Sequence, residues 1–358
     1  MRIGLFGFPR TGKSTLFSLL TGAAPPHAGG REEARIGIAR VPDPRLDRLS
    51  AMYRPRKTTP ATVEYVDLHG VAKGEAAEAL PLDQLRVADA LAHVVRGFRD
   101  EAVPHVEGPV DPARDVATME TELVLADHTI AERRIEKLDL SVRKAHRDDD
   151  RKELDLLRKC LQALERDVPL RNLEFSEEET RRLRGFTFLS LKPLLVVVNA
   201  DEADASLLAG GAPAFGLEAA TARPSTEVVC LSARIEGEIA QLEADEASAF
   251  RAELGIAEPA LERMIRASYR LLGCISFFTV GDDECRAWTI HRGTRARPAA
   301  GAVHSDMERG FIRAELVAYD DLVAAGSWAA CRDHGTLRLE GKDYVVRDGD
   351  VINFRFGV

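Results

Sequence analysis

The residues with the clearest chemistry lie near the N-terminus, in the loop from Gly7 to Ser14. The loop reads GFPRTGKS and matches the pattern G-x-x-x-x-G-K-[ST]. In such a loop the glycines let the backbone turn and aim successive N–H groups at phosphate oxygens. We expect Lys13 to reach the β and γ phosphates and the hydroxyl of Ser14 to ligate Mg²⁺. The pattern therefore predicts a site for a nucleoside triphosphate.

The elements on either side of this loop fit that interpretation. Residues 2–6, RIGLF, form a short apolar strand that runs directly into the loop. Residues 14–22, STLFSLLTG, predict a helix whose N-terminal end carries partial positive charge and stabilises the same anion. A chance match in a glycine-containing turn would not need a strand before it and a helix after it.

A second strand, residues 62–66, ends at Asp67 and is followed by Gly70, which gives the motif D-x-x-G. We expect Asp67 to hold Mg²⁺ through a water molecule and the N–H of Gly70 to sense the γ-phosphate. An Asp and a Gly after a strand often form only a turn. The assignment therefore depends on the combination of this motif with the phosphate loop.

A third strand, residues 193–198, is a continuous apolar run of the kind found in buried parallel sheets. It ends at Asn199, where ligands bind in a doubly wound sheet. GTPases carry N-K-x-D at this position, and its Asp accepts two guanine N–H donors. Here Ala200 follows the Asn and Glu202 is the fourth residue, so the sequence leaves guanine preference open.

A fourth strand, residues 227–231, leads to Ser232, Ala233 and Arg234. This is the position of the base-side S-A-K segment of related nucleotide-binding domains. An ordinary turn at the end of a strand explains the same residues equally well. The predicted base contact of Ser232 is therefore one of two open readings.

The composition is that of a globular protein with more than one domain. The chain has 358 residues, of which 45% are hydrophobic and 30% charged, so we expect two or three units. The net charge of −9 argues against a protein that coats nucleic acid by bulk electrostatics, because that mode needs clustered Lys and Arg. A local basic face is still compatible with this charge.

The sequence predicts a cytoplasmic protein. Its longest apolar run, residues 194–198, is far shorter than the ~20 residues needed to cross a bilayer. The first residues lack the longer apolar stretch and the cleavage site of a signal peptide. Since no C-x-x-C pair is present, we expect reduced thiols and no structural zinc at the five cysteines, Cys160, Cys230, Cys274, Cys285 and Cys331.

Residues 116–183 carry apolar side chains at spacings of three and four among many Glu, Arg and Lys, which predicts an antiparallel helical hairpin. The turn is expected at residues 146–150, where charges cluster. A charged helix face is usually only solvated. We nevertheless interpret the hairpin as a partner-binding arm, on the premise that an insertion into another domain has little to bury by itself.

The last 85 or so residues read as several short strands with turns, and the final strand alternates from Asp350 to Phe356. No catalytic constellation occurs there, and we expect a small binding module. Scattered surface charge is the commoner explanation of its basic residues, but five could face RNA: Arg286, Arg313, Arg338, Lys342 and Arg355.

These segments together resemble one family, the YchF-type or Obg-like ATPases of the translation-factor class of P-loop proteins. The resemblance covers nearly the whole chain and rests on GFPRTGKST, VPDPRLDRL, VEYVDLHG, HVVRGF, HVEGPVDPARD, RASYRLLG, RAWTI, ERGFIRAE, LEGKDYVV and DGDVINFRF. It implies an α/β P-loop G domain with a mostly parallel, doubly wound sheet, an inserted helical hairpin and a C-terminal TGS domain of β-grasp type. We place the G domain at 1–118 and 187–272, the arm at 119–186 and the TGS-like domain at 273–358.

The resemblance also implies an activity and a set of site residues. ATP would be preferred over GTP, hydrolysis would be slow, and the protein would associate with the ribosome or its RNA. The phosphates would be bound by Gly7 and by Arg10, Thr11, Gly12, Lys13, Ser14 and Thr15, the metal by Ser14 and Asp67, and the base side by Asn199, Ala200, Glu202 and Ser232. Lys13, Asp67 and Gly70 would act in hydrolysis.

Two departures from the family pattern leave open that this is a divergent paralogue. Arg31 stands where the first switch normally carries a Thr that completes the Mg²⁺ shell, and the second switch is shorter than usual. Val71 occupies the position of a water-orienting Gln, and a hydrophobic residue cannot orient water. The neighbouring His69 is better explained as a solvated turn residue. The missing metal ligand could be replaced by Thr58, Thr59 or Thr62.

Three functions are therefore compared. The first is a slow, Mg²⁺-dependent ATPase whose nucleotide state controls docking on the ribosome or another RNA–protein partner. The second is an adaptor that is stabilised by nucleotide and has little or no hydrolysis, and the third is a GTPase. Lys13, Ser14 and Asp67 favour the first over the second, whereas Arg31 favours the second. We expect the protein to be mostly monomeric.

Overall fold

The computed structural model describes residues 1–24, 34–68, 82–145, 148–201, 208, 210–254, 256 and 258–357. Its contacts group the chain into two compact units: Met1–Gly37 with Glu64–Ala267, and Ile38–Val63 with Ser268–Val358. The predicted domain boundaries stay a prediction, and this grouping differs from them in two respects. The arm is not a separate unit, and residues 38–63 and 268–272, which we assigned to the G domain, group with the C-terminal segment.

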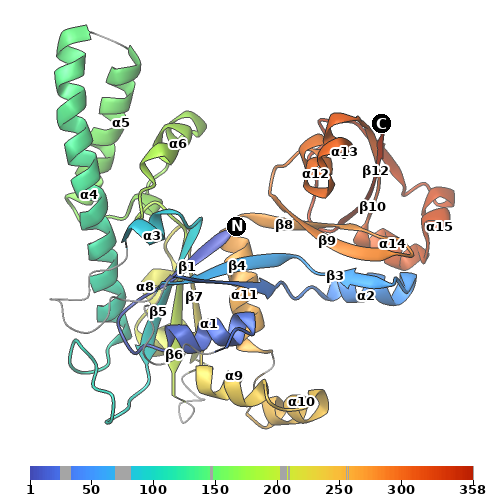
Figure 1. Cartoon of the computed structure of the whole chain (residues 1–358), viewed down its shortest axis with the longest axis horizontal. Coiled ribbons are helices and arrows are strands. Elements are labelled where there is room, and N and C mark those ends of the chain that lie inside the picture. Colours follow the sequence, from blue (N-terminus) through green and yellow to red (C-terminus); the bar gives the residue numbers. More distant parts are fainter. Residues whose placement is uncertain are drawn as a thin grey trace. The chain divides into compact units, whose positions relative to one another are not determined.

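The first unit is built on a six-stranded sheet of order β2-β4-β1-β5-β6-β7 (Figure 1). The pairs β1–β4, β1–β5, β5–β6 and β6–β7 are parallel, so the carboxyl ends of these strands meet at one edge. The strands are β1 (Arg2–Phe6), β2 (Arg35–Arg40), β4 (Thr62–Asp67), β5 (Ala90–Gly97), β6 (Leu194–Ala200) and β7 (Thr226–Leu231).

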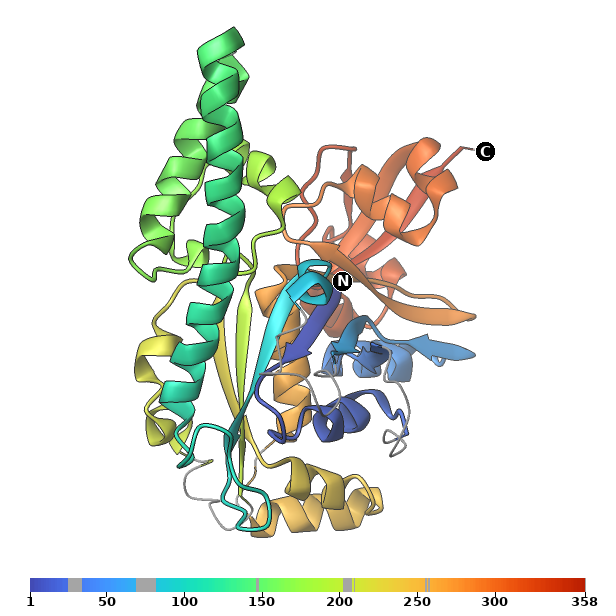
Figure 2. The ribbon, with the colours of Figure 1, turned by 60° about the vertical axis from the view of Figure 1, so that its left-hand side comes forward.

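Helices cover both faces of this sheet, with α4 on one side and α1 on the other (Figure 2). Every residue of β6 is buried, as its continuous apolar run predicts. The predicted α/β fold is therefore confirmed. Its helices outside the arm are α1 (Lys13–Thr21), α3 (Leu82–Arg86), α8 (Glu218–Thr221), α9 (Ala233–Ile239), α10 (Ala244–Glu253) and α11 (Ala260–Leu271), with the short 3₁₀ helix η4 (Ala212–Phe215).

The predicted hairpin is present and forms the arm. Helix α4 (Pro112–Ala145) runs for 34 residues and α5 (Asp148–Leu164) returns beside it, so the two helices end and begin where the charge cluster predicts the turn. The arm continues through η1 (Leu170–Asn172), α6 (Glu177–Leu183) and η2 (Arg184–Phe186).

The premise that the arm buries little by itself is wrong. Its helices and the segment that follows them enclose their own cluster of buried side chains, including Leu157, Cys160 and Leu183. The middle of α4 is held by the fully buried carboxylate of Asp127, which accepts the N–H of Leu189 at 2.9 Å. The arm is therefore stabilised by its own core, and a binding role does not follow from its being an insertion.

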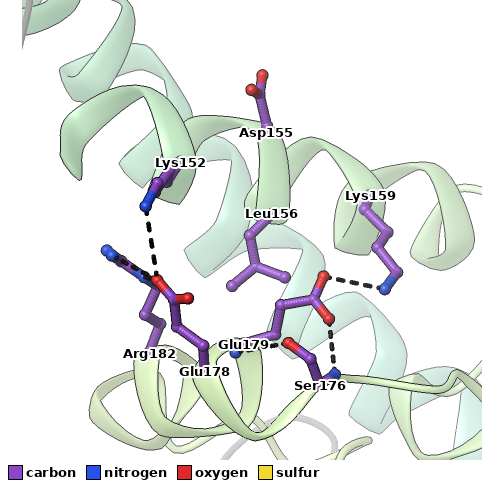
Figure 3. A pocket seen from close by; sticks show the side chains of 8 residues that line it. All are labelled: Lys152, Asp155, Leu156, Lys159, Ser176, Glu178, Glu179 and Arg182. Atoms are coloured by element: carbon purple, nitrogen blue, oxygen red, sulfur yellow. Dashed lines mark hydrogen bonds and ion pairs between the residues drawn. The ribbon is translucent and has the colours of Figure 1, made fainter. Parts of the chain in front are cut away.

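A cavity of about 330 Å³ lies between α5 and α6 (Figure 3). Charged side chains of α5 and α6 contact one another across it: Lys159 contacts Glu179 at 3.1 Å and Lys152 contacts Glu178 at 3.9 Å. Ser176 and Glu179 close the N-terminus of α6 as a capping box. Because these groups are used to fasten α6 to α5, we assign the cavity no ligand.

The second unit has a six-stranded sheet of order β11-β10-β12-β8-β9-β3. Strands β8, β9, β10, β11 and β12 with helix α12 form the predicted β-grasp, in which β12 is parallel to β8. Its elements are β8 (Cys274–Thr279), β9 (Glu284–His291), α12 (Ala296–Val303), α13 (Ser305–Arg309), β10 (Phe311–Ala318), α14 (Tyr319–Ala325), α15 (Trp328–Asp333), β11 (Arg338–Glu340) and β12 (Asp350–Phe356).

The remaining elements of this unit, α2 (Pro44–Tyr53) and β3 (Lys57–Thr59), come from the N-terminal third of the chain. Strand β3 adds to the sheet as a parallel neighbour of β9. Arg45 of α2 also bonds to Asp348 at 2.9 Å. These contacts explain why residues 38–63 group with the C-terminal segment.

The part of the chain that the structure describes contains no helix that is both long and apolar enough to cross a membrane. The five cysteines are buried free thiols.

Candidate phosphate-binding site

The phosphate loop follows β1 and ends at α1, as predicted, and its geometry requires glycine at both ends. Gly7 has φ 139° and Gly12 has φ 94°, a region that other residues rarely adopt. A Cβ atom on Gly7 would lie 2.4 Å from the carbonyl oxygen of Val94, and one on Gly12 would lie 2.4 Å from Nδ2 of Asn199. The close packing of this loop on β5 and β6 therefore fixes two positions of the motif.

The loop holds the side chain of Lys13 against its own backbone. The ammonium Nζ of Lys13 donates to the carbonyl oxygens of Gly7 at 3.0 Å and of Phe8 at 2.6 Å. The hydroxyl of Thr11 also donates to the carbonyl of Phe8, at 3.2 Å. A cation held at the N-terminus of α1 is what an incoming phosphate needs, since little reorganisation is then required.

Asn199, near the end of β6, connects the loop to the start of α9. Its Nδ2 donates to the carbonyl oxygen of Thr11 at 3.0 Å, and its Oδ1 accepts the N–H of Ala233 at 2.9 Å. Ser232 caps α9 by accepting the N–H of Ile235. Asn199 and Ser232, which were predicted to face the base, therefore bond to the backbone around the site. Their contacts with the base stay a prediction.

Asp67 and Ser14, the residues predicted to ligate Mg²⁺, both lie in the described part of the site. Asp67 is fully buried at the end of β4, beside Leu5 of β1, and Ser14 lies in the first turn of α1. No group of three or more His, Cys, Asp or Glu side chains in the described ranges could hold a metal ion. One carboxylate and one hydroxyl nevertheless fit Mg²⁺, which is commonly bound by one or two carboxylates, substrate phosphates and water.

The three threonines proposed as substitutes for the missing Mg²⁺ ligand of the first switch are not positioned to take that role. Thr58 donates to the hydroxyl of Ser50 at 2.8 Å and Thr59 donates to Glu284, both within the second unit. Thr62 begins the strand that Asp67 ends, which separates them by about 16 Å at the rise of an extended chain. The structure therefore favours none of the three.

Sequence reasoning did not assign a role to His93, which lies beneath the loop on β5. Its ring stacks on Phe6 with centroids 4.8 Å apart and is 1% exposed. Burial, with a smaller contribution from Lys13, lowers the pKa of His93 to about 3. The imidazole is therefore neutral at physiological pH and adds no charge that would compete with Lys13. The feature of the sequence that could have pointed to His93 is the presence of a histidine inside an apolar strand.

A loop after β5 also lies close to the phosphate loop. The sequence analysis did not predict this contact. The buried guanidinium of Arg96 holds it by donating to the carbonyl oxygens of Phe98 at 3.1 Å and Val103 at 2.7 Å. Further along, His105 packs edge-on against Phe8 and contacts Asp115 of α4 at 2.9 Å. These contacts place the start of the arm next to the phosphate loop.

Comparison with curated proteins identifies the family. The chain is 42% identical to a Bacillus subtilis protein named ribosome-binding ATPase YchF, over 99% of both chains. It is 39% identical to the Escherichia coli O157:H7 protein of the same name, over 100% of this chain and 99% of the relative. The chain belongs to the YchF family.

A solved structure and a family model agree with the YchF assignment. The structure titled as the Schizosaccharomyces pombe YchF GTPase matches with a TM-score of 0.88 at 30% identity, over 99% of this chain and 97% of that one. The model YchF-GTPase_C, described as a protein of unknown function (DUF933), matches residues 274–357. The resemblance predicted from the sequence is confirmed along the whole chain.

The remaining predicted site residues divide into two groups. Arg10 and Thr15 are exposed on the loop and the first turn of α1, and Ala200 is buried at the end of β6. The other predicted positions lie outside the described residues: Arg31, His69, Gly70, Val71 and Glu202.

Proposed function

We propose that this YchF protein binds ATP with Mg²⁺, hydrolyses it slowly, and uses its nucleotide state to regulate association with the ribosome. The observation that carries the proposal is the preformed loop in which Gly7 and Phe8 hold Lys13 at the N-terminus of α1. A loop of this kind binds phosphates through backbone N–H groups and one cation.

Magnesium would be held by Ser14 and Asp67 together with phosphate oxygens and water. When bound, it would neutralise charge that develops on the phosphates. Ser14 is placed by the first turn of α1, and Asp67 by its position at the end of β4. The residues of the chain otherwise act by positioning, which is consistent with slow turnover.

ATP is proposed over GTP because Ala200 replaces the Lys of N-K-x-D and is buried at the end of β6. The names of the relatives differ on this point: the curated bacterial proteins are called ATPases, whereas the solved fission yeast structure is called a GTPase. A GTPase is therefore the alternative. Equilibrium titration with fluorescent ATP and GTP analogues, each with and without Mg²⁺, distinguishes the two. Tighter binding of GTP than of ATP would contradict the proposal.

The second alternative is a nucleotide-stabilised adaptor. It is favoured by Arg31, which stands at the position of the switch threonine, and by the bonding of two proposed substitutes, Thr58 and Thr59, to other groups. The adaptor predicts Mg²⁺-dependent nucleotide binding with no turnover. The proposed enzyme predicts turnover that is lost when Lys13 is removed.

Ribosome association is supported by the names of the curated relatives, and it is tested through the arm. Deleting the arm from residue 119 would remove Met119 and Leu123, which pack into the sheet core. A better truncation replaces residues 135–152 with a short Gly/Ser linker and closes the hairpin at Arg134 and Glu153, which bond at 2.7 Å.

This truncated protein should keep its nucleotide affinity and lose nucleotide-dependent cosedimentation with ribosomes. Unchanged cosedimentation would show that the distal arm is not the contact. A ribosome factor of this kind would be cytoplasmic and mostly monomeric, and analytical ultracentrifugation checks the second point.

A further inference from the structure

The second unit contains a cavity of about 510 Å³ that the proposed nucleotide chemistry does not use. Four consecutive residues of β12 line it, from Ile352 to Arg355. Successive side chains of a strand point to opposite faces of the sheet. In β12, Ile352 and Phe354 are buried in the core, whereas Asn353 and Arg355 are exposed. The cavity therefore opens beside the edge of β12, in the plane of the sheet.

This edge of β12 is largely unpaired. Strand β12 pairs with β10 from Asp350 to Phe356 but with β8 only at Val351, opposite Phe278. In the parts of the chain that the structure describes, no strand follows β8 beside the rest of β12. The last residues of β12 therefore have one sheet neighbour and one open side.

The direction of the backbone groups follows from two hydrogen bonds. Gly357 N–H donates to the carbonyl oxygen of Gly310 at 2.8 Å, and Tyr319 N–H donates to that of Gly349 at 3.0 Å. Bonding to a given neighbour alternates along an antiparallel strand, so the odd-numbered residues of β12 bond to β10. Phe354 must then direct its N–H and C=O toward the open side. Buried main-chain groups of this kind need a partner.

The walls of the cavity differ on the two faces of the sheet. On the core face they are apolar and include Trp288, Val303 and Met307. Trp328, Arg332 and Leu337, from α15 and the segment after it, complete the lining. Both tryptophans of the chain therefore line this one cavity.

The lining carries two Glu and two Arg side chains, and three of these four are bonded to other side chains. Glu315 is already bonded to Arg355 at 2.9 Å and to Arg313 at 3.2 Å. Glu284 is bonded to Thr59. Within the described residues, Arg332 makes no side-chain hydrogen bond or ion pair, so it is the lining cation that is available to a carboxylate.

We propose that this groove binds an extended segment of a partner protein, which adds as a strand to the open edge of β12. The segment has alternating apolar and acidic side chains, with the apolar ones on the side of Trp288 and Met307 and an acidic one beside Arg332. Main-chain bonds to Ile352–Phe356 supply affinity, and the two sets of walls supply specificity. This binding role is separate from the nucleotide site.

The test uses the full-length protein and the emission of its two tryptophans. The probe is a mixture of acetylated, amidated pentapeptides that alternate Val or Ile with Asp or Glu. A saturable change in emission is expected. Peptides of the same sequences with N-methylated backbone at alternate residues should bind at least tenfold more weakly, because they cannot complete the strand pairing.

Arg332→Glu should weaken binding of the acidic peptides at least tenfold, whereas Arg292→Glu, an equal charge change at an exposed position outside the groove, should leave it unchanged. Trp328→Leu is a second variant that removes one wall and keeps Trp288 as the reporter. Circular dichroism and nucleotide titration confirm that each variant is folded.

Four results would overturn the proposal. The first is no saturable change in emission up to millimolar peptide, and the second is equal binding of the N-methylated peptides. The third is a saturable change with a uridine decamer and none with the peptides, and the fourth is a change that arises from self-association of the protein and not from the peptides. Failure here with normal ATP binding would leave the proposed nucleotide function intact, so the two proposals fail separately.

Discussion

Asn199 holds the carbonyl oxygen of Thr11 through its Nδ2, at 3.0 Å, although 188 residues separate them in the chain. Its Oδ1 simultaneously accepts the N–H of Ala233. One buried amide therefore joins the phosphate loop, the end of β6 and the start of α9. The geometry of the nucleotide site depends on this side chain even where it touches no ligand.

Replacing this amide should weaken nucleotide binding. Asn199→Ala leaves the buried C=O of Thr11 and the N–H of Ala233 without their partner, which costs about 1–3 kcal/mol. We expect ATP affinity to fall by about tenfold or more in an equilibrium titration. Ser232→Ala, which removes only the cap of α9, should have the smaller effect. An Asn199→Ala protein with wild-type affinity would show that the bridge is not needed.

Gly12 should not tolerate a side chain. In Gly12→Ala the new Cβ would meet Nδ2 of Asn199 at 2.4 Å, in a backbone conformation with φ 94°. A strain of about 1–3 kcal/mol is expected, so phosphate binding should weaken roughly 5- to 150-fold. Gly185→Ala is the matched control, because open space surrounds that position. The comparison fails if both variants bind ATP like the wild type.

His93 should make the protein sensitive to acid. Its pKa is lowered to about 3 in the folded state by burial and by Lys13, whereas the unfolded chain protonates near pH 6.5. The unfolded state therefore binds the extra proton first, and stability is full above pH 6.5 and falls as the pH decreases toward 3. Between pH 6.5 and pH 4 the loss should be roughly 3 kcal/mol.

Chemical denaturation across this pH range measures the effect. His93→Phe keeps a ring against Phe6 and should flatten the dependence between pH 6.5 and 4. His291→Phe changes an exposed histidine and should leave the curve as it is. Identical curves for the wild type and His93→Phe would assign the acid sensitivity to other groups.

The arm should contribute to folding stability through its own core. Leu157 is fully buried between the arm helices, so Leu157→Ala should lower the free energy of unfolding by about 2–5 kcal/mol. Leu140 on the same hairpin is 58% exposed, and Leu140→Ala should change stability by less than about 0.5 kcal/mol. Equal effects of the two substitutions would contradict the presence of an arm core.

Features encoded within a few neighbouring residues could be predicted from the sequence. The phosphate loop, the buried run of β6 and the hairpin spacing each carry a local signal, and the structure contains all three elements. The family resemblance supplied the β-grasp assignment and the order of the parts.

Features that depend on distant pairing could not be predicted. Nothing in the residues Lys57–Thr59 shows that they join β9, more than 200 positions later. The bridging role of Asn199 depends on Thr11 and Ala233 being brought together by the sheet. The same holds for the arm core, since the spacing of apolar residues predicts a hairpin but not the segment after it that closes the cluster.

The most direct test of the proposed function is ATP turnover by the purified protein with and without Mg²⁺, beside Lys13→Ala and the control Lys152→Ala. Lys152 is an exposed lysine of the arm that contacts Glu178. Slow, Mg²⁺-dependent phosphate release that is lost in Lys13→Ala and kept in Lys152→Ala is the predicted result. Tight ATP binding without any turnover, or turnover that survives in Lys13→Ala, would contradict it.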